Sequence, residues 1–365
     1  MVYRKSTRTL LVAGEGNDTL AELDAHAIAP ALEPLRTYHV GLEYGDKVHI
    51  ASACGAPTGI ALSADETTAY VFCRATYDLS IVTLDGYDES APFQPGPIPF
   101  IHLADDAATD EVAMGRRLFY DATDDTTSGG LACAGCHPEG RDDGFVWHEM
   151  PKSEFEKDHL LIGTPFALDA SGEQVKELGQ ARQTPMLAGR VAATGPYGWL
   201  AESPTLERRI RGGFHMHRWF QSWRNDVSIP ELHMREGTLA AFLRDGLVPP
   251  PAHASELSPE EARGQELFMS ESTQCSGCHA PKTAYTDRSL SPLRKLAPRR
   301  GYDEDDTAAF RVPSLLFVGG TAPYYHDGHA ATLEQLVDQN HDRMGKTDHL
   351  SAGDRAALVA FLRTL

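Results

Sequence analysis

The sequence predicts a mainly α-helical fold, in which two related helical domains follow one another behind a small all-β segment. Three observations predict this arrangement. The motif Cys-x-x-Cys-His occurs twice, at 133–137 and at 275–279, and each copy follows the same helical phrase. The first hundred residues instead contain short runs of β-forming residues separated by polar turns. We therefore expect a strand-rich segment over 1–98 and helical domains over 99–250 and 251–365.

The strand-rich segment contains two rounds of the same pattern of strand, polar turn and strand. The runs at 8–13 and 19–24 belong to the first round, and the runs at 69–73 and 78–85 belong to the second. Over residues 8–86 this pattern resembles the blades of β-propellers with YVTN-type repeats. Two blades cannot close a propeller, which typically needs about 4–8 of them. Either earlier blades are missing from the sequence, or the strands pack on the next domain as a small sheet.

Two cysteines outside the repeated motif lie in the strand-rich segment. Cys54 and Cys73 would form a disulfide in an oxidising compartment, and two buried free thiols are the alternative. Composition also marks two linkers. Residues 91–99 contain four prolines before the first helical domain, and 248–252 contain three prolines between the two helical domains.

The helical part contains the same unit twice, starting at about residue 107. The phrase Ala-x-Gly-x-x-Leu-Phe occurs at 113–119 and at 262–268, on a predicted helix that leads to each cysteine motif. Its glycine removes a side chain where another helix must cross closely. Each unit closes on a helix that ends with Ala-Phe-Leu-Arg, at 241–244 and at 360–363.

Three shorter phrases also recur between each cysteine motif and the closing helix. They are, with the first copy given first, Gln183–Leu187 and Arg311–Leu315, Thr194–Tyr197 and Thr321–Tyr324, and Thr205–Glu207 and Thr332–Glu334. A generic helical repeat would not explain why a cysteine motif stands at the same place in both copies.

Each Cys-x-x-Cys-His motif is typical of covalent haem attachment. The two sulfurs would form thioethers with the vinyl groups on one edge of the porphyrin, and the following histidine would ligate the iron. A four-cysteine zinc site or a redox dithiol would leave both histidines unexplained. The sequence therefore predicts two covalently bound haem c groups, held by Cys133, Cys136, His137, Cys275, Cys278 and His279.

Composition and charge restrict the class of protein further. The 365 residues carry a formal net charge of -19, which argues against nucleic acid as a partner. No run approaches the ~20 apolar residues that a membrane span needs. The apolar run at 9–13 is also shorter than the core of a signal peptide. Covalent haem attachment takes place outside the bacterial cytoplasm, so we expect a periplasmic or otherwise extracytoplasmic protein whose sequence begins inside a longer precursor.

The paired cysteine motifs and the phrase Thr-Ala-Pro-Tyr-x-His-Asp-Gly at 321–328 resemble the bacterial dihaem cytochrome c peroxidase and MauG family. The resemblance covers about residues 107–365 and implies two domains of the class I cytochrome c fold. It also implies an oxidoreductase that reduces hydrogen peroxide. Electrons from a small donor, a c-type cytochrome or a cupredoxin, would enter at the C-terminal haem and pass to the N-terminal haem. Such peroxidases often bind Ca2+ between the two domains, although no residue here indicates its ligands.

The resemblance implies a second axial ligand for the C-terminal haem, which is Met in the peroxidases and Tyr in the MauG type. Met344, shortly before the last helix, fits the Met position. A thioether ligand raises the haem potential, as an electron-input haem requires. His341 is the rival ligand, and a core side chain is the alternative role of Met344. The segment 333–345 contains no Tyr, which argues against the MauG variant.

The N-terminal half departs from the family pattern at two places. The family has a Trp between the haems, but 173–182 contains none, and Trp147 and Trp199 are candidates by proximity only. The distal glutamate of the family has no counterpart in 191–197. This weakens the case for peroxidase activity, because a general acid–base group assists cleavage of the O–O bond. Gln183 could provide a distal hydrogen bond, or it could be an amide that packs in a turn.

The internal repeat indicates a candidate sixth ligand for the first haem. Counted from the shared Thr-Leu-Glu phrase, the position of Met344 falls on the cluster that contains His215 and His217. The rival ligands are His148 and His159. Two further functions remain open, namely a non-enzymatic electron carrier with both irons six-coordinate and a MauG-like oxidase that modifies a partner protein. An open coordination site at the first haem would distinguish an enzyme from a carrier.

Overall fold

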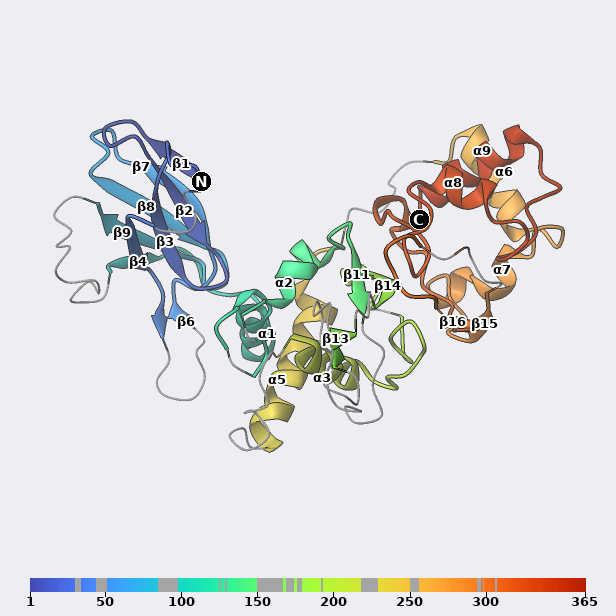
Figure 1. Ribbon diagram of the computed structural model, residues 1–365, viewed down its shortest axis with the longest axis horizontal. Helices are drawn as coiled ribbons and strands as arrows, with labels where there is room; N and C mark the ends of the chain where they lie inside the picture. Colours follow the sequence, from blue (N-terminus) through green and yellow to red (C-terminus); the bar gives the residue numbers. More distant parts are fainter. Residues whose placement is uncertain are drawn as a thin grey trace. The chain divides into compact units, whose positions relative to one another are not determined.

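The computed structural model of the chain combines helices and strands (Figure 1). Helices account for 29% and strands for 21%, so the expectation of a mainly α fold is not clearly confirmed. Two compact units divide the chain, Met1–Gly135 with His217–Gly246 and Cys136–Met216 with Leu247–Leu365. The structure describes residues 1–29, 34–43, 51–84, 98–124, 126–128, 130–149, 167–168, 174–175, 179–191, 193–217, 229–249, 256–293, 297, 299–305 and 307–365.

The first unit begins with two four-stranded antiparallel sheets, which correspond to the two predicted rounds of strands. The first sheet has the order β1 (Val2–Arg4), β2 (Thr9–Gly14), β3 (Thr19–Asp24) and β4 (Arg36–His39). The second has the order β10 (Phe100–His102), β9 (Asp78–Thr83), β8 (Thr68–Cys73) and β7 (Pro57–Leu62). A short pair stands between them in the chain, formed by β5 (Leu42–Glu43) and β6 (Ala51–Ala53). The propeller itself is not confirmed.

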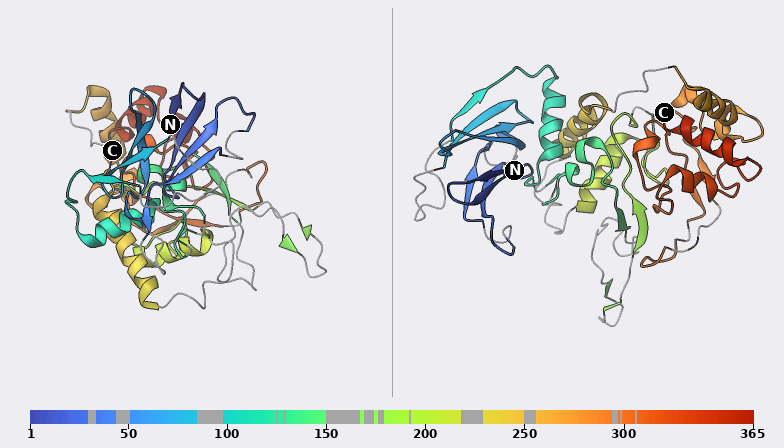
Figure 2. Two further views of the ribbon diagram at one scale, coloured as in Figure 1. Left: turned by 90° about the vertical axis from the view of Figure 1, so that its left-hand side faces the viewer. Right: turned by 90° about the horizontal axis from the view of Figure 1, so that it is seen from above.

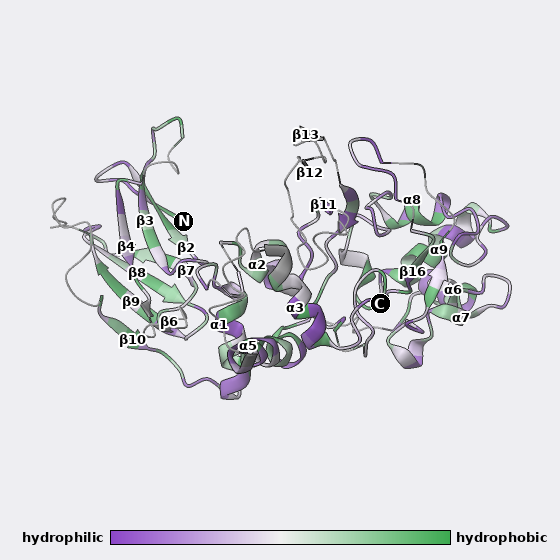
Figure 3. Cartoon of the chain, turned by 60° about the horizontal axis from the view of Figure 1, so that its bottom comes forward, coloured by the Kyte–Doolittle hydropathy of each residue, from purple (hydrophilic) through white to green (hydrophobic). Residues whose placement is uncertain are grey.

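One hydrophobic core serves both sheets. Buried and more exposed residues alternate along the strands, as expected where one face of a sheet is covered, and Figure 3 shows the accompanying changes of hydropathy. Leu11 of the first sheet and Val71 and Val82 of the second belong to the same buried cluster. The structure holds Cys54 and Cys73 as fully buried thiols. A hydrogen bond with Cys54, together with burial, raises the pKa of the Cys73 thiol far above its usual range.

In the first unit, the opening and closing helices cross at a glycine. They are α1 (Asp110–Tyr120) and α5 (Ile229–Ala241), which continues into the π-helical turn η2 (Phe242–Gly246). A Cβ on Gly115 would collide with the backbone carbonyl of Thr238, so only glycine permits this approach. The rings of Phe119 and Phe242 complete the contact, with centroids 5.3 Å apart and planes at 56°.

The second unit repeats this crossing with its own helices, α6 (Pro259–Met269) and α9 (Ala352–Leu362). Figures 1 and 2 show the two helices side by side. A Cβ on Gly264 would collide with the carbonyl of Ala357. The rings of Phe268 and Phe361 again lie 5.3 Å apart at 56°. The glycine of the repeated phrase thus has the predicted role in both copies.

The remaining elements follow the repeat in part. They are α2 (Cys133–Cys136), η1 (Pro138–Gly140), β11 (Val146–Glu149), β12 (Ala167–Leu168), β13 (Gln174–Val175), β14 (Gln180–Gln183), α3 (Leu206–His217), α7 (Cys275–Cys278), η3 (Pro281–Thr283), β15 (Leu290–Pro292), β16 (Ala309–Arg311), η4 (Val318–Gly320) and α8 (Leu333–Asp338). The antiparallel pairs β11–β14 and β15–β16 occupy equivalent places after the two cysteine motifs. Within the described ranges, no helix has both the length and the apolar character that crossing a bilayer requires.

Two reciprocal hydrogen bonds join the copies inside the second unit. The backbone N–H of Gln183 donates to the carbonyl of His326 at 2.7 Å, and the N–H of Arg311 donates to the carbonyl of Trp199 at 2.8 Å. Gln183 and Arg311 are equivalent in the repeat, and so are Trp199 and His326. The first copy therefore contacts the second as the second contacts the first.

Candidate functional site

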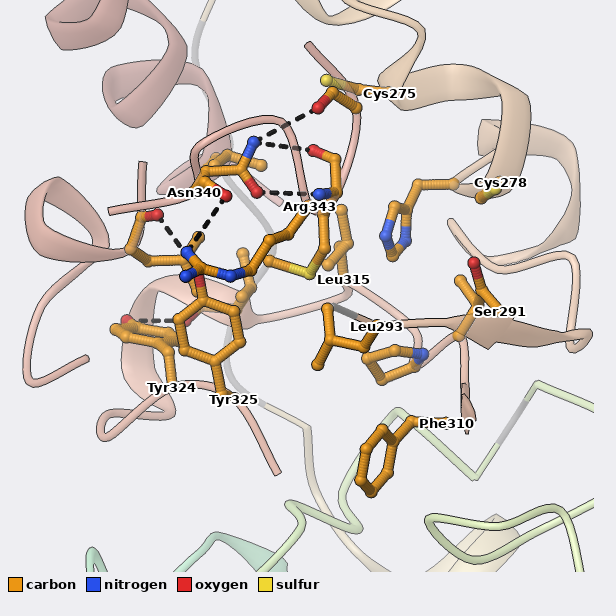
Figure 4. A pocket seen from close by; sticks show the side chains of 18 of the residues that line it. Cys275, Cys278, Ser291, Leu293, Phe310, Leu315, Tyr324, Tyr325, Asn340 and Arg343 are labelled. Carbon is orange, nitrogen blue, oxygen red and sulfur yellow. Dashed lines mark hydrogen bonds between the residues drawn. The ribbon is translucent and has the colours of Figure 1, made fainter. Parts of the chain in front are cut away.

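The second cysteine motif opens onto a cavity of about 250 Å3 in the second unit (Figure 4). The cavity is lined by Cys275, Cys278 and His279 from the motif and by Met344 from the loop before the last helix. Apolar side chains form much of the remaining wall, namely Phe268, Leu293, Leu315, Val318, Leu358 and Leu362. The structure thus brings together the four residues that sequence reasoning assigned to the C-terminal haem.

His279 is oriented as a metal-binding histidine. Its Nδ1 lies 2.9 Å from the backbone carbonyl oxygen of Tyr285, and a carbonyl can only accept a hydrogen bond. The proton therefore resides on Nδ1, which leaves the lone pair of Nε2 for a metal. Burial lowers the pKa of His279, which favours the neutral imidazole that ligation requires.

A glycine brings the Met344 loop against the cysteine motif. Gly345 has a φ of 69°, and a Cβ there would stand 2.6 Å from the carbonyl oxygen of Thr273 and 3.2 Å from the Cys275 Sγ. The N–H of Lys346 donates to the same Thr273 carbonyl at 2.7 Å. A side chain at Gly345 would therefore push the loop, and Met344 with it, away from Cys275.

Asn340 holds the other side of this loop, and sequence reasoning did not identify it. Its Oδ1 accepts a hydrogen bond from the N–H of Met344 at 2.8 Å. Its Nδ2 donates to the carbonyl of Met344 at 3.2 Å and to Thr347 Oγ1 at 2.9 Å. Asn340 is only 2% exposed, so its amide fixes the backbone on both sides of Met344.

His341, the rival ligand, is placed differently. Its side chain is 58% exposed, and its Nδ1 lies 3.5 Å from Asp348 Oδ1. It is absent from the described residues that line the cavity, whereas Met344 is among them. The placement of these two residues favours Met344 as the ligand.

The residues of the cavity fit a haem c. Cys275 and Cys278 would provide the two sulfurs for thioether bonds, and His279 and Met344 would provide an imidazole and a thioether to the iron. The surrounding wall is largely apolar, as expected for a site that encloses a porphyrin.

The first cysteine motif forms the short helix α2, and the boundary between the compact units falls inside it, between Gly135 and Cys136. Burial raises the pKa of Cys136 to about 11. Trp147 lies on β11, where its indole N–H donates to Asp143 Oδ2 at 2.8 Å and to Thr184 Oγ1 at 3.1 Å. These bonds fix Trp147 beside the loop that follows the first motif.

Some of the residues predicted for the first haem have a described position elsewhere. Gln183 and Trp199 line the cavity beside the second cysteine motif. His148 lies on β11, and its ring stacks on Tyr302 with centroids 4.1 Å apart. The backbone of His215 and His217 belongs to the end of α3. The predicted rival His159 lies outside the described residues.

Calcium ligands do not emerge from the described part of the chain. Among those residues, no group of three or more His, Cys, Asp or Glu side chains comes together to hold a metal ion. The predicted calcium site therefore stays a prediction.

Comparisons with known proteins found distant relatives among cytochrome c peroxidases and MauG proteins. No protein-family model matches the chain. The cytochrome c551 peroxidase of Nitrosomonas europaea is 24% identical over 299 residues, which are 74% of this chain and 84% of that protein. The methylamine utilization protein MauG of Methylorubrum extorquens is 25% identical over 292 residues, which are 70% of this chain and 78% of that protein. A chain of the Kuenenia stuttgartiensis hydrazine synthase superposes with a TM-score of 0.51 at 20% identity, over 72% of this chain and 89% of that one.

The distant homologues of this chain are thus cytochrome c peroxidase and MauG proteins. They support an oxidoreductase of the peroxidase-like or MauG-like kind that carries haem. The hydrazine synthase chain shows a likeness of fold alone.

Proposed function

We propose that this protein is an extracytoplasmic dihaem oxidoreductase that reduces hydrogen peroxide with electrons from a small c-type cytochrome or cupredoxin. The first haem would be held by Cys133, Cys136 and His137, and the second by Cys275, Cys278, His279 and Met344. Bound haem iron would supply the one-electron chemistry that no amino-acid side chain here provides. The protein itself orients the ligands, sets their protonation and excludes water.

The observation that carries this proposal is the cavity of the second motif. His279 presents Nε2 because Tyr285 accepts the proton on Nδ1, and Asn340 fixes the loop that carries Met344. An imidazole and a thioether give a haem a higher potential than two imidazoles would. This favours the second haem as the one that takes electrons from the donor.

The first copy of the repeat supplies residues to the second-haem cavity. Trp199 lines it, and its indole N–H donates to the carbonyl of Gln183 at 3.2 Å, which fixes the ring. Trp147 is instead bonded to Asp143 and Thr184. We therefore assign to Trp199 the place of the Trp that stands between the haems in the peroxidase and MauG family.

A second candidate function is a non-enzymatic electron carrier. The segment 191–197 contains no carboxylate that could act as the distal acid–base group, and this observation favours a carrier. A MauG-like oxidase acting on a partner protein is the third candidate, and the similarity to MauG supports it. A thioether at Met344 in place of a tyrosine ligand speaks against that third candidate.

The test is a steady-state assay of the haem-loaded protein with a reduced small c-type cytochrome as donor. The proposal predicts that donor oxidation depends on hydrogen peroxide. It also predicts that the double variant Cys275→Ala/Cys278→Ala loses this activity, whereas the matched control Cys54→Ala keeps it. A protein that exchanges electrons with the donor but is indifferent to peroxide would contradict the peroxidase proposal and leave the carrier.

A further inference from the structure

The wall of the second-haem cavity contains three buried polar nitrogen atoms without a hydrogen-bond partner. They are Arg311 Nε, His326 Nδ1 and Arg343 Nε. A guanidinium Nε–H can only donate, so two of the three atoms lack an acceptor. Unsatisfied buried donors are rare in folded proteins, and two of them around one cavity indicate that an acceptor belongs inside it. His326 Nδ1 would be a third donor when the ring carries both protons.

The cavity wall is also positively charged. Arg190, Arg311 and Arg343 all line it, and none forms an ion pair with a carboxylate among the described residues. Arg190 donates to the carbonyl of Leu316 at 2.6 Å, and Arg343 donates to the carbonyl of Asn340 at 3.3 Å. Burial lowers the pKa of Arg190 to about 10, and the charge of Asp142 offsets only part of this effect.

The histidine His326 also lies in the wall of this cavity. It is 7% exposed, and its ring stacks on Phe310 with centroids 3.8 Å apart and planes at 18°. Its Nε2 lies 3.5 Å from Asp305 Oδ2, which occupies that side of the ring. The stacking and the carboxylate fix the ring, and Nδ1 is left for a group inside the cavity.

We infer that Arg311, His326 and Arg343, together with Arg190, recognise the two propionate carboxylates of the haem attached at Cys275 and Cys278. This inference rests on the proposed function. The propionates are the only anionic groups of the macrocycle, and they lie on the edge opposite the vinyl groups that form the thioethers. Figure 4 shows the two cysteines in the upper part of the cavity, Phe310 in its lower part and Arg343 beside Asn340.

The proposed recognition site for one haem contains residues from both copies of the repeat. Arg190 belongs to the first copy, and Arg311, His326 and Arg343 belong to the second. Cations close to the propionates favour the reduced iron, because reduction removes one positive charge from the haem. The site therefore raises the potential of the second haem, in the same direction as the thioether of Met344.

The experiment compares Arg311→Gln, Arg343→Gln and His326→Phe in the full haem-loaded chain. One readout is the midpoint potential of the second haem from a spectroelectrochemical titration. The other is the propionate bending band in the resonance Raman spectrum. Each arginine variant should lower the ratio of ferrous to ferric second haem at fixed applied potential roughly three- to tenfold, the size expected for one unit charge. All three variants should shift the Raman band.

Two further variants complete the experiment, one that keeps the charge of Arg311 and one that serves as a control. Arg311→Lys keeps the positive charge but lacks the planar guanidinium that binds a carboxylate through two donors. The midpoint potential of the second haem should therefore be unchanged, and the Raman band should shift. Arg263→Gln removes an exposed arginine that pairs with Asp354, and it should change neither readout. If mass spectrometry shows attached haem in Arg311→Gln and Arg343→Gln, but neither the potential nor the Raman band changes, the propionate inference is overturned and the proposed function stands. Absence of haem at Cys275 and Cys278 in the unmutated protein would overturn the proposed function itself.

Discussion

The rings of Trp199 and His326 meet edge to face, with centroids 6.4 Å apart and planes at 71°. Each residue stands two positions after the tyrosine of its Thr-x-Pro-Tyr phrase, so the pair joins equivalent positions of the two copies. Both residues line the cavity beside the second cysteine motif. An internal repeat has thus placed an aromatic residue of the first copy in the wall of the cavity that the second copy forms.

The ring pair should make a measurable contribution to the free energy of unfolding. In a double-mutant cycle with Trp199→Ala and His326→Ala, we expect a coupling energy of about 0.5–1.5 kcal/mol, because edge-to-face rings gain that much beyond their buried area. Urea denaturation of the four proteins measures it. If the changes in unfolding free energy of the two single variants add up to that of the double variant, the two rings are neighbours that do not interact.

The helix crossing at Gly264 should not tolerate a methyl group. We expect Gly264→Ala to lower the free energy of unfolding by about 1–3 kcal/mol, because the new Cβ must displace the carbonyl of Ala357. Gly212→Ala on α3 is the matched control, since a Cβ there meets no atom within 4 Å. That control should be neutral or gain up to about 1 kcal/mol from higher helix propensity. Equal effects of the two substitutions would contradict the close crossing.

Met344 should be distinguishable from His341 by ligand exchange. We expect Met344→His to lower the potential of the second haem and to remove the optical band of thioether-to-iron charge transfer. His341→Ala should leave both properties unchanged, because His341 is exposed and faces Asp348. The measurement is a redox titration combined with the absorption spectrum of the oxidised protein. Loss of the band in His341→Ala rather than in the Met344 variant would refute the assignment.

The buried ion pair between Asp124 and Arg235 should make the first unit sensitive to acid. Burial opposes ionisation of Asp124 most strongly, but Arg235 at 2.7 Å and the backbone of Thr127 outweigh it, so the pKa of Asp124 lies below its usual value. A carboxyl group with a lowered folded-state pKa stabilises the fold above its unfolded-state pKa of about 3.9, and that contribution is lost as pH falls through the folded-state value.

Removing one partner of this pair tests the argument. We expect Asp124→Asn to cost about 3–5 kcal/mol at neutral pH, because Arg235 would be left buried without its anion. The unfolding free energy of the unmutated protein should fall more steeply between pH 5 and pH 2 than that of the variant, with the pH limits taken as roughly those of carboxylate titration. Parallel pH profiles would mean that Asp124 does not contribute to acid sensitivity.

The sequence predicted those parts of the site that depend on local spacing. The Cys-x-x-Cys-His motifs and the glycine of the first helix belong to short phrases whose geometry is set within a few residues, whereas the resemblance to the peroxidase family implied Met344. The structure places Met344 and His279 at one cavity, and it gives Gly115 and Gly264 the crossing role that the repeat predicted.

The residues that sequence reasoning missed depend on tertiary contacts. Asn340 acts by bonding a loop that only the fold brings around it, and the Tyr285 carbonyl is a backbone group without any sequence signal. Gln183 was expected beside the first haem but lies at the second cavity, because the copies exchange reciprocal contacts that spacing along one chain does not reveal. An unusual residue in an otherwise repeated phrase, such as Trp199 opposite His326, was the available signal.

A hydrogen peroxide titration of the haem-loaded protein, followed by optical and EPR spectroscopy, tests most directly whether the first haem reacts with peroxide. It is carried out first on the oxidised protein and then on the half-reduced protein, in which the second haem holds one electron. The proposal predicts two haems per chain, an open coordination site at the first haem in one of the two states, and a spectral change there on addition of peroxide. Two low-spin haems that peroxide leaves unchanged in both states would contradict it and identify an electron carrier.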